Sequence, residues 1–230
     1  MSQALYPSEP FPSRTSASPE PQPPILFVDT AHVRRAEIER FIEARFEKAF
    51  GARLPRHYPL LTCLCANDAG GEILAAAGVR FAEEGPLFLE QYLDSPVEQA
   101  VAVAFGRPVA RDSIVEIGSL ASDSPDASLR LFGALASWLA DHCGRRFAVA
   151  TARPELERLL GRAGFGLSTL GHANPRRLGE GAGDWGSYYA RTPRVFAGEI
   201  GDSSALPLLR QRLRARTMDR AVRRLRKGAP

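Results

Sequence analysis

Residues 114–165, IVEIGSLASDSPDASLRLFGALASWLADHCGRRFAVATARPELERLLGRAGF, decide the fold. The pattern predicts an apolar strand at the start of this stretch, followed by a helix over Leu129–His142, a strand over Phe147–Thr151 and a helix over Pro154–Ala163. Strands and helices that alternate at this spacing form a βαβ unit, whose short connections make the two strands parallel. The sequence therefore predicts a sheet that contains a parallel strand pair.

Glu116 is an acid embedded in the first of these strands, among apolar residues. A carboxylate inside an apolar strand costs several kcal/mol unless it is paired, neutralised or facing a cleft. Two explanations stay open. Glu116 is a general base, with its pKa raised by apolar surroundings, that removes a proton from an acceptor amine. Alternatively, it forms a structural ion pair with an arginine such as Arg80 or Arg111.

The rest of the chain predicts an α/β (α+β) protein whose mixed sheet is mostly antiparallel, with helices flanking a central splayed parallel pair. A strand is expected from Ile25, a helix over Ala31–Phe50, and a hairpin from the runs 60–66 and 72–82. The aromatic run SYYARTPRVFAGEI, residues 187–200, is expected to be the last strand.

Three segments are expected along the 230 residues. Residues 1–24 hold seven of the 18 prolines and are expected to be disordered, and residues 25–203 form the globular domain. Residues 204–230 form a basic amphipathic helix, most clearly over Pro207–Lys227. The positions from 205 onward carry a net charge of +8, so the remainder of the chain carries −4.

Cysteine usage and hydropathy point to a cytoplasmic protein. Cys63 and Cys65 are two positions apart on a predicted strand, so they share one face and fit packing in a reducing compartment. No apolar run is long enough to cross a bilayer, and no secretory signal peptide is visible. The four histidines show no paired spacing, so we expect no metal site.

Three strings carry a family resemblance: VEIGSLAS (115–122), LFGALASWLA (131–140) and DWGSYYARTPRVFAGEI (184–200). Together they resemble the thermostable hemolysin family over about residues 25–200, and the family's name records lysis of red cells. The resemblance implies a GNAT-like acyltransferase fold, in which two parallel strands splay apart and the thioester arm of the donor bonds to the free strand edge.

The string VEIGSLAS also resembles a strand of acyl-homoserine-lactone synthases. In those enzymes the strand acid is followed three residues later by a basic residue, whereas this chain has Ser119. Ser119 and Leu120 are expected to bind substrate at the free strand edge, but amine recognition of the synthase type is not carried over.

The densest aromatic cluster of the chain contains Trp185, Tyr188 and Tyr189. Strand alternation would send the two tyrosines to opposite faces, so that at most one faces a cleft. We assign Tyr188 as an acid that protonates the leaving thiolate, with Trp185 and Tyr189 contacting substrate. The other interpretation is a buried aromatic plug.

Two charged residues complete the predicted site. Glu90 is expected to line the same cleft, its alternative being a surface acid, and Arg80 to receive a carboxylate or phosphate, its alternative being a solvated strand end. The loop ASDSPDAS, residues 121–128, has no glycine and has two acids, Asp123 and Asp126. These acids would oppose a pyrophosphate by roughly 1 kcal/mol each.

The sequence therefore predicts an N-acyltransferase that moves a fatty acyl group from an acyl thioester to a small-molecule amine. The donor is acyl-CoA or an acyl carrier protein, whose acidic surface the Arg-rich tail could meet, and no cofactor is held permanently. The alternative function is a membrane-active hemolysin whose basic C-terminal helix lies peripherally on lipid at the inner membrane surface. We do not expect nucleic acid as a partner, because no recognition motif is present.

Overall fold

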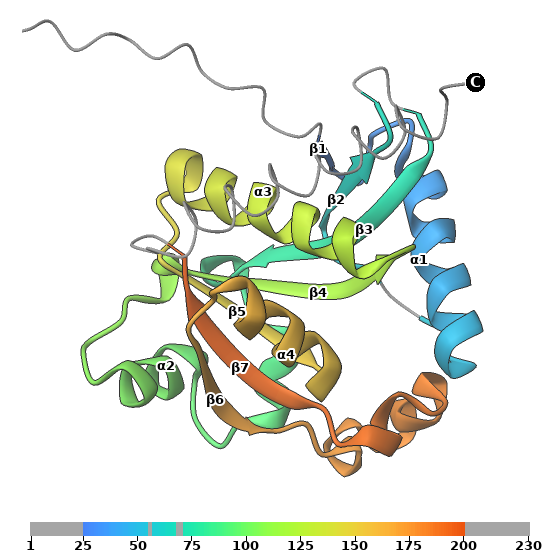
Figure 1. Cartoon of the computed structure of the whole chain (residues 1–230). Helices are drawn as coiled ribbons and strands as arrows, with labels where there is room; N and C mark the ends of the chain where they lie inside the picture. Colours follow the sequence, from blue (N-terminus) through green and yellow to red (C-terminus); the bar gives the residue numbers. More distant parts are fainter. Residues whose placement is uncertain (1–24, 55–56, 68–70, 201–230) are drawn as a thin grey trace, which may run out of the picture.

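The computed structural model describes residues 25–54, 57–67 and 71–200. Seven strands form one sheet in the order β1-β2-β3-β4-β5-β7-β6 (Figure 1). Strands β4 and β5 pair in parallel, and every other neighbouring pair is antiparallel. This arrangement confirms the predicted fold class. The predictions for residues 1–24 and for the basic helix over Pro207–Lys227 lie outside the described residues.

The elements follow one another along the chain as strands, helices and short 3-10 helices. The strands are β1 (Ile25–Val28), β2 (Leu60–Cys65), β3 (Ile73–Phe81), β4 (Ile114–Ser122), β5 (Phe147–Ala152), β6 (Leu167–His172) and β7 (Arg194–Glu199). The α-helices are α1 (Arg35–Phe50), α2 (Val97–Phe105), α3 (Pro125–Cys143) and α4 (Pro154–Ala163). The 3-10 helices are η1 (Ala82–Glu84), η2 (Phe88–Tyr92), η3 (Arg111–Ser113), η4 (Pro175–Trp185) and η5 (Tyr188–Arg191).

Helices cover both faces of the sheet. Helices α3 and α4 pack on one face, where Leu135 and Leu160 join Val115 of β4 in the largest core cluster (Figure 1). Helix α1 covers the opposite face over β2 and β3, and η2 and α2 cover that same face over β5 and β7. The sheet is therefore the middle layer of the molecule, with its alternate side chains buried on each side.

Helix α3 begins four residues before the predicted start. Ser124 has extended backbone angles, its side chain accepts a hydrogen bond from the Ala127 amide, and Pro125 occupies the first helical turn. A serine cap followed by proline is a favoured helix start. The serine side chain accepts a hydrogen bond from an amide that has no partner inside the helix, and proline has no amide hydrogen that would need one. The apolar periodicity alone, which begins at Leu129, placed the start too late.

The parallel pair β4–β5 separates after three residues. Ile114, Val115 and Glu116 pair with residues 147–149, and no pair follows, although β4 runs on to Ser122 and β5 to Ala152. A bulge on β4 accompanies the separation: Ser119 has a φ of 49°, and the register with β3 shifts here. Bulges bend a strand and increase its local twist, which turns β4 away from β5 and opens a wedge between them.

The expected strand over residues 187–200 is wrong in its first half. Tyr188 and Tyr189 lie in η5, and pairing with β5 and β6 begins only at Arg194. The Ser187 amide donates to the Phe50 carbonyl at the end of α1, 2.8 Å away. The turn at Thr192, with a φ of 43°, precedes the proline that opens the strand. The alternation argument for the two tyrosines therefore does not apply.

Candidate active site

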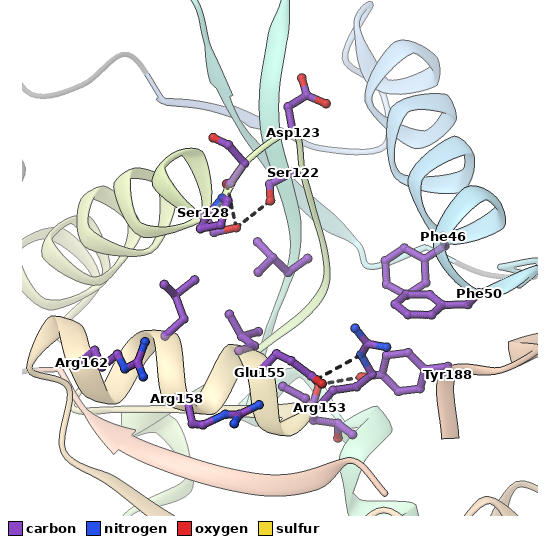
Figure 2. Close-up of a pocket in the computed structure, with 17 residues that line it drawn as sticks. Phe46, Phe50, Ser122, Asp123, Ser128, Arg153, Glu155, Arg158, Arg162 and Tyr188 are labelled. Atoms are coloured by element: carbon purple, nitrogen blue, oxygen red, sulfur yellow. Dashed lines mark hydrogen bonds and ion pairs between the residues drawn. The ribbon is translucent and has the colours of Figure 1, made fainter. Parts of the chain in front are cut away.

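Two cavities meet at the open end of the wedge. The first, the α3–α4 cavity, is about 620 Å³ and lies between the starts of helices α3 and α4 (Figure 2). The second, the aromatic cavity, is about 300 Å³ and is formed by α1, η2, η4 and η5. Both cavities share three lining residues: Phe46, Thr151 and Tyr188. The two cavities are therefore neighbours with these three side chains as a common wall.

Aromatic residues are nearly half of those that line the aromatic cavity. Trp185 packs within 5.6 Å of Phe88, 5.4 Å of Tyr188 and 6.0 Å of Tyr189, measured between ring centroids. The full lining comprises Phe46, Leu54, Tyr58, Phe88, Gln91, Tyr92, Gly118, Ser119, Thr151, Leu178, Gly181, Asp184, Trp185, Tyr188 and Tyr189. Both tyrosines of η5 face the cavity, because they lie in a 3-10 turn rather than on a strand.

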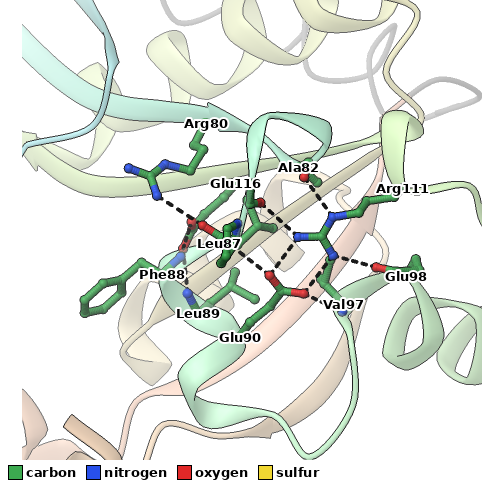
Figure 3. A network of polar contacts seen from close by, with 12 residues as sticks. Arg80, Ala82, Leu87, Phe88, Leu89, Glu90, Val97, Glu98, Arg111 and Glu116 are labelled. Atoms are coloured by element: carbon green, nitrogen blue, oxygen red, sulfur yellow. Dashed lines mark hydrogen bonds and ion pairs between the residues drawn. The ribbon is translucent and has the colours of Figure 1, made fainter.

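Glu116 is the most deeply buried acid of the described chain, with 1% of its surface exposed. Its carboxylate accepts hydrogen bonds from the backbone amides of Phe88 and Leu89, at 2.8 and 3.0 Å (Figure 3). Burial raises the pKa of this carboxyl from 4.5 to about 7, against the lowering effect of the two amides, the Tyr58 hydroxyl and the charge of Arg80. A carboxyl with a pKa near neutrality can take up and release a proton under ordinary conditions.

Tyr58 lies between Glu116 and the aromatic cavity. Its ring lies across Gly78 and Gly118, which are opposite each other in the β3–β4 register. A Cβ atom at either glycine would overlap the ring or its hydroxyl. The hydroxyl hydrogen-bonds the Glu116 carboxylate, and the ring lines the cavity, so Tyr58 connects the buried acid to the cavity.

Sequence reasoning missed Tyr58, although the chain carried a signal for it. Two glycines opposite each other on neighbouring strands leave a patch of bare backbone, which an aromatic ring can cover. The register that pairs Gly78 with Gly118 joins strands far apart in the sequence, which the sequence did not reveal.

Arg111 is the centre of a polar network beneath the site (Figure 3). Its guanidinium pairs with Glu90 at 2.8 Å and with Glu98 at 2.7 Å, and it donates to the carbonyls of Ala82 and Gly85. The predicted ion pair between Arg111 and Glu116 is therefore wrong.

Glu90 is a structural member of the same network. Arg111 lowers the pKa of the Glu90 carboxyl to about 2, and this carboxylate also accepts from the amides of Leu87 and Val97. Glu90 lines neither cavity. It fixes the start of η2, and the amides that follow, those of Phe88 and Leu89, hold Glu116.

Arg80 lies opposite Glu116 in the β3–β4 register and likewise lines neither cavity. Its guanidinium donates to the Pro86 carbonyl at 3.1 Å and lies 6.0 Å from the centre of the Tyr58 ring. Arg80 therefore acts on the site through its charge, which favours the ionised form of Glu116.

The junction of the two cavities holds two hydroxyl groups. The Tyr188 hydroxyl donates to the carbonyl oxygen of Thr151 at 3.2 Å, and burial raises the pKa of Tyr188 well above its usual value. The buried side-chain hydroxyl of Thr151 has no hydrogen-bond partner within the described residues. Ser119 lines the aromatic cavity and Leu120 lines the α3–α4 cavity, so the bulge presents its two residues to different cavities.

The α3–α4 cavity combines an apolar floor with arginines. Arg153, Arg158 and Arg162 come from the start and the exposed side of α4, and Figure 2 shows Arg158 and Arg162 on that wall. On the opposite wall Asp123 is ion-paired with Arg45 of α1, and Asp126 is absent from the lining. Of the two acids expected here, only Asp123 lines the cavity. A further acid, Glu155, also lines it and pairs with Arg153 and Arg191, and the arginines of this wall were not anticipated.

No group of three or more His, Cys, Asp or Glu side chains in the described part of the chain is arranged to hold a metal ion. Among the described helices, none is both long and apolar enough to cross a membrane.

A mixed sheet whose central parallel strands splay apart is typical of GNAT-like folds, and the chain has this fold. The sequence profile described as thermostable hemolysin matches residues 28–204, so the chain belongs to the thermostable hemolysin family. No curated protein sequence matches the chain.

Solved structures support the same fold at low sequence identity. The CoA-dependent acyl-homoserine lactone synthase BjaI, solved with MTA, aligns with a TM-score of 0.56 at 15% identity, over 82% of this chain and 88% of BjaI. The CoA-dependent acyl-homoserine lactone synthase MesI aligns with 0.51 at 16% identity, over 82% and 94%. FeeM, an N-acyl amino acid synthase from uncultured soil microbes, aligns with 0.50 at 12% identity, over 76% and 88%.

Proposed function

We propose that this protein transfers an acyl group from a thioester to an amine. The observation that carries the proposal is the wedge between β4 and β5, where the two cavities meet beside Glu116 and Tyr58. One cavity would hold the donor and the other the acceptor, so that the thioester and the amine meet at the junction. Holding two reactants in this way removes much of the entropic cost of their encounter.

The α3–α4 cavity fits the donor. An extended pantetheine arm can hydrogen-bond to the free edge of β4 beyond Glu116, as an added strand would. Arg158 and Arg162 of α4 and Arg153 just before it line this cavity, and arginine suits the phosphate groups of a donor. Acyl-CoA and a phosphopantetheine-bearing carrier protein both present such groups; the structures of BjaI with SAM and isopentyl-CoA and of the CoA-dependent MesI favour CoA as the first donor to test.

Glu116 and Tyr58 would remove the proton from the acceptor. An amine enters as an ammonium ion and has no lone pair with which to attack. Tyr58 accepts one ammonium proton on its hydroxyl oxygen as it passes its own proton to the Glu116 carboxylate, with which it is hydrogen-bonded. The freed amine lone pair then attacks the thioester carbonyl carbon.

Tyr188 is placed to complete the reaction. As the tetrahedral intermediate collapses, the carbon–sulfur bond breaks and its electron pair leaves on sulfur. The Tyr188 hydroxyl at the junction can protonate this thiolate. The attacking nitrogen loses its second proton as the amide forms, and this proton restores the Tyr188 hydroxyl, while Glu116 releases the first proton to solvent through Tyr58. The products are an amide and a free thiol.

The proposal is tested by measuring thiol release. Acyl-CoA donors of increasing chain length are incubated with an amine mixture, and the free thiol and the amide are quantified. We expect turnover that rises with pH around pH 7, because ionised Glu116 is the active form. Glu116→Gln should lower kcat by about 100-fold or more and flatten this pH profile.

Tyr58→Phe tests the connection between the acid and the amine. This variant keeps the ring over the two glycines but removes the hydroxyl, so we expect a loss similar to that of Glu116→Gln. Thr62→Val is the matched control, because it also removes one buried hydroxyl from the sheet and Thr62 lines neither cavity. Unchanged turnover in Glu116→Gln would refute the assigned base, and no thiol release with any donor would refute acyl transfer.

A further inference from the structure

We propose that the acceptor is a small primary amine with an aromatic body and no acidic group, such as an arylalkylamine. This inference rests on the proposed function and identifies the substrate class that the aromatic cavity would bind. It is argued from the rings, the charges and the size of that cavity.

The rings of the cavity offer faces and edges to a flat ligand. Seven of its lining residues are aromatic: Phe46, Tyr58, Phe88, Tyr92, Trp185, Tyr188 and Tyr189. Their planes differ, with interplanar angles of 39° for Phe88 and Trp185 and 81° for Tyr188 and Tyr189. Aromatic rings favour tilted and edge-to-face contacts of this kind with another ring, so an aromatic ligand gains contacts in any of several orientations.

The charges of the cavity select against acids. None of its lining residues in the described chain is Lys, Arg or His, and Asp184 is an acid at its exposed rim. A carboxylate in this cavity would lose its hydration without gaining a cation, at a cost of several kcal/mol. An ammonium group would instead be attracted by Asp184, by the ring faces and by ionised Glu116 behind Tyr58.

Size and position agree with a small ligand. A volume of about 300 Å³ is at the lower end of small-molecule sites. Tyr58 lines this cavity at its boundary with Glu116, so a ligand whose ring contacts Trp185 can direct its amine to the Tyr58 hydroxyl. An amino acid acceptor, by contrast, would bring a carboxylate into the same space.

The first experiment compares matched amines at a saturating acyl-CoA concentration. Phenethylamine, phenylalanine and phenylalanine methyl ester share one ring and differ only in the acidic group. We expect kcat/KM for phenethylamine to exceed that for phenylalanine by about 100-fold, and the ester to recover most of the loss. Phenylalanine or butylamine performing as well as phenethylamine would overturn the proposal.

The second experiment assigns the cavity to the amine rather than to the acyl chain. Trp185→Leu should raise KM for phenethylamine about tenfold while leaving KM for the donor unchanged. Trp138→Leu is the matched control, since Trp138 packs on Phe27 and lines neither cavity. A changed preference for acyl-chain length in Trp185→Leu, with an unchanged amine KM, would show that the cavity holds the acyl chain and would overturn the proposal.

Calorimetric titration without donor separates this inference from the proposed function. Binding of phenethylamine in preference to phenylalanine, lost in Trp185→Leu, supports the amine site even when no thioester turns over. Turnover with other amines, but no binding of phenethylamine, would refute the amine class and leave acyl transfer standing.

Discussion

The Glu116 carboxyl should make the stability of the protein depend on pH in an unusual direction. Its pKa rises from 4.5 in the unfolded chain to about 7 in the folded protein, mainly because it is buried. The folded state therefore holds the proton more tightly than the unfolded state. The resulting stabilisation is complete below pH 4.5 and is lost as the pH rises through 7. This difference of about 2.5 in the pKa of Glu116 corresponds to about 3 kcal/mol in the free energy of unfolding.

Glu116→Gln removes this titration. At pH 5 we expect the variant to be about 1–3 kcal/mol less stable than the wild type, because both oxygens of the acid accept backbone amides and an NH2 group must face one of them. Between pH 5 and pH 8 the wild type loses about 3 kcal/mol through this group and the variant does not. The variant should therefore match or exceed the stability of the wild type at pH 8.

Paired urea unfolding curves at pH 5, 6, 7 and 8 measure this effect, because the difference between two proteins cancels every other titrating group. Glu83→Gln is the control: Arg145 lowers the pKa of the Glu83 carboxyl, so its small contribution has the opposite sign. A constant difference between Glu116→Gln and the wild type across this range would refute the buried, proton-binding carboxyl.

Further variants test the parts that hold the site together. Gly118→Ala places a methyl group against the Tyr58 ring, so we expect the free energy of unfolding to fall by about 1–3 kcal/mol and most of the acyl-transfer activity to be lost. Gly161→Ala, on an open helix surface, is the control and should be neutral or stabilising by up to about 1 kcal/mol. Arg111→Met leaves two carboxylates without their cation, and thermal unfolding should show a loss of about 2–4 kcal/mol. Tyr188→Phe should lower the free energy of unfolding by about 1 kcal/mol, and should slow the release of thiol from the donor when a good amine acceptor is present.

The fold could be predicted from the sequence because its central unit is local. Residues 114–165 carry strand and helix periodicities in an order that permits one pairing of the two strands, and the structure confirms that pairing. Glu116 was recognised for a related reason: an acid in an apolar strand conflicts with its surroundings, and such conflicts concentrate at functional sites.

The rest of the site depends on contacts that no local pattern encodes. Tyr58 reaches Glu116 because the register of β3 and β4, two strands far apart in the sequence, places Gly78 opposite Gly118. Tyr188 and Tyr189 were placed on a strand because the run reads as β-like, but the contact of Ser187 with the end of α1 prevails over that propensity. The sequence offers Arg111 as an ion-pair partner for Glu116. The path of η2 instead places other acids beside Arg111.

Main-chain hydrogen bonds to Glu116 affect which substitutions can accumulate around it as the family diverges. Its carboxylate is bound by main-chain groups of positions 88 and 89, not by side chains. Mutational drift at these two positions can therefore reshape the neighbouring binding surface while the acid keeps its ligands. Proline is the one replacement that removes such an amide. New binding preferences can thus arise next to Glu116 without disturbing the main-chain groups that hold its carboxylate.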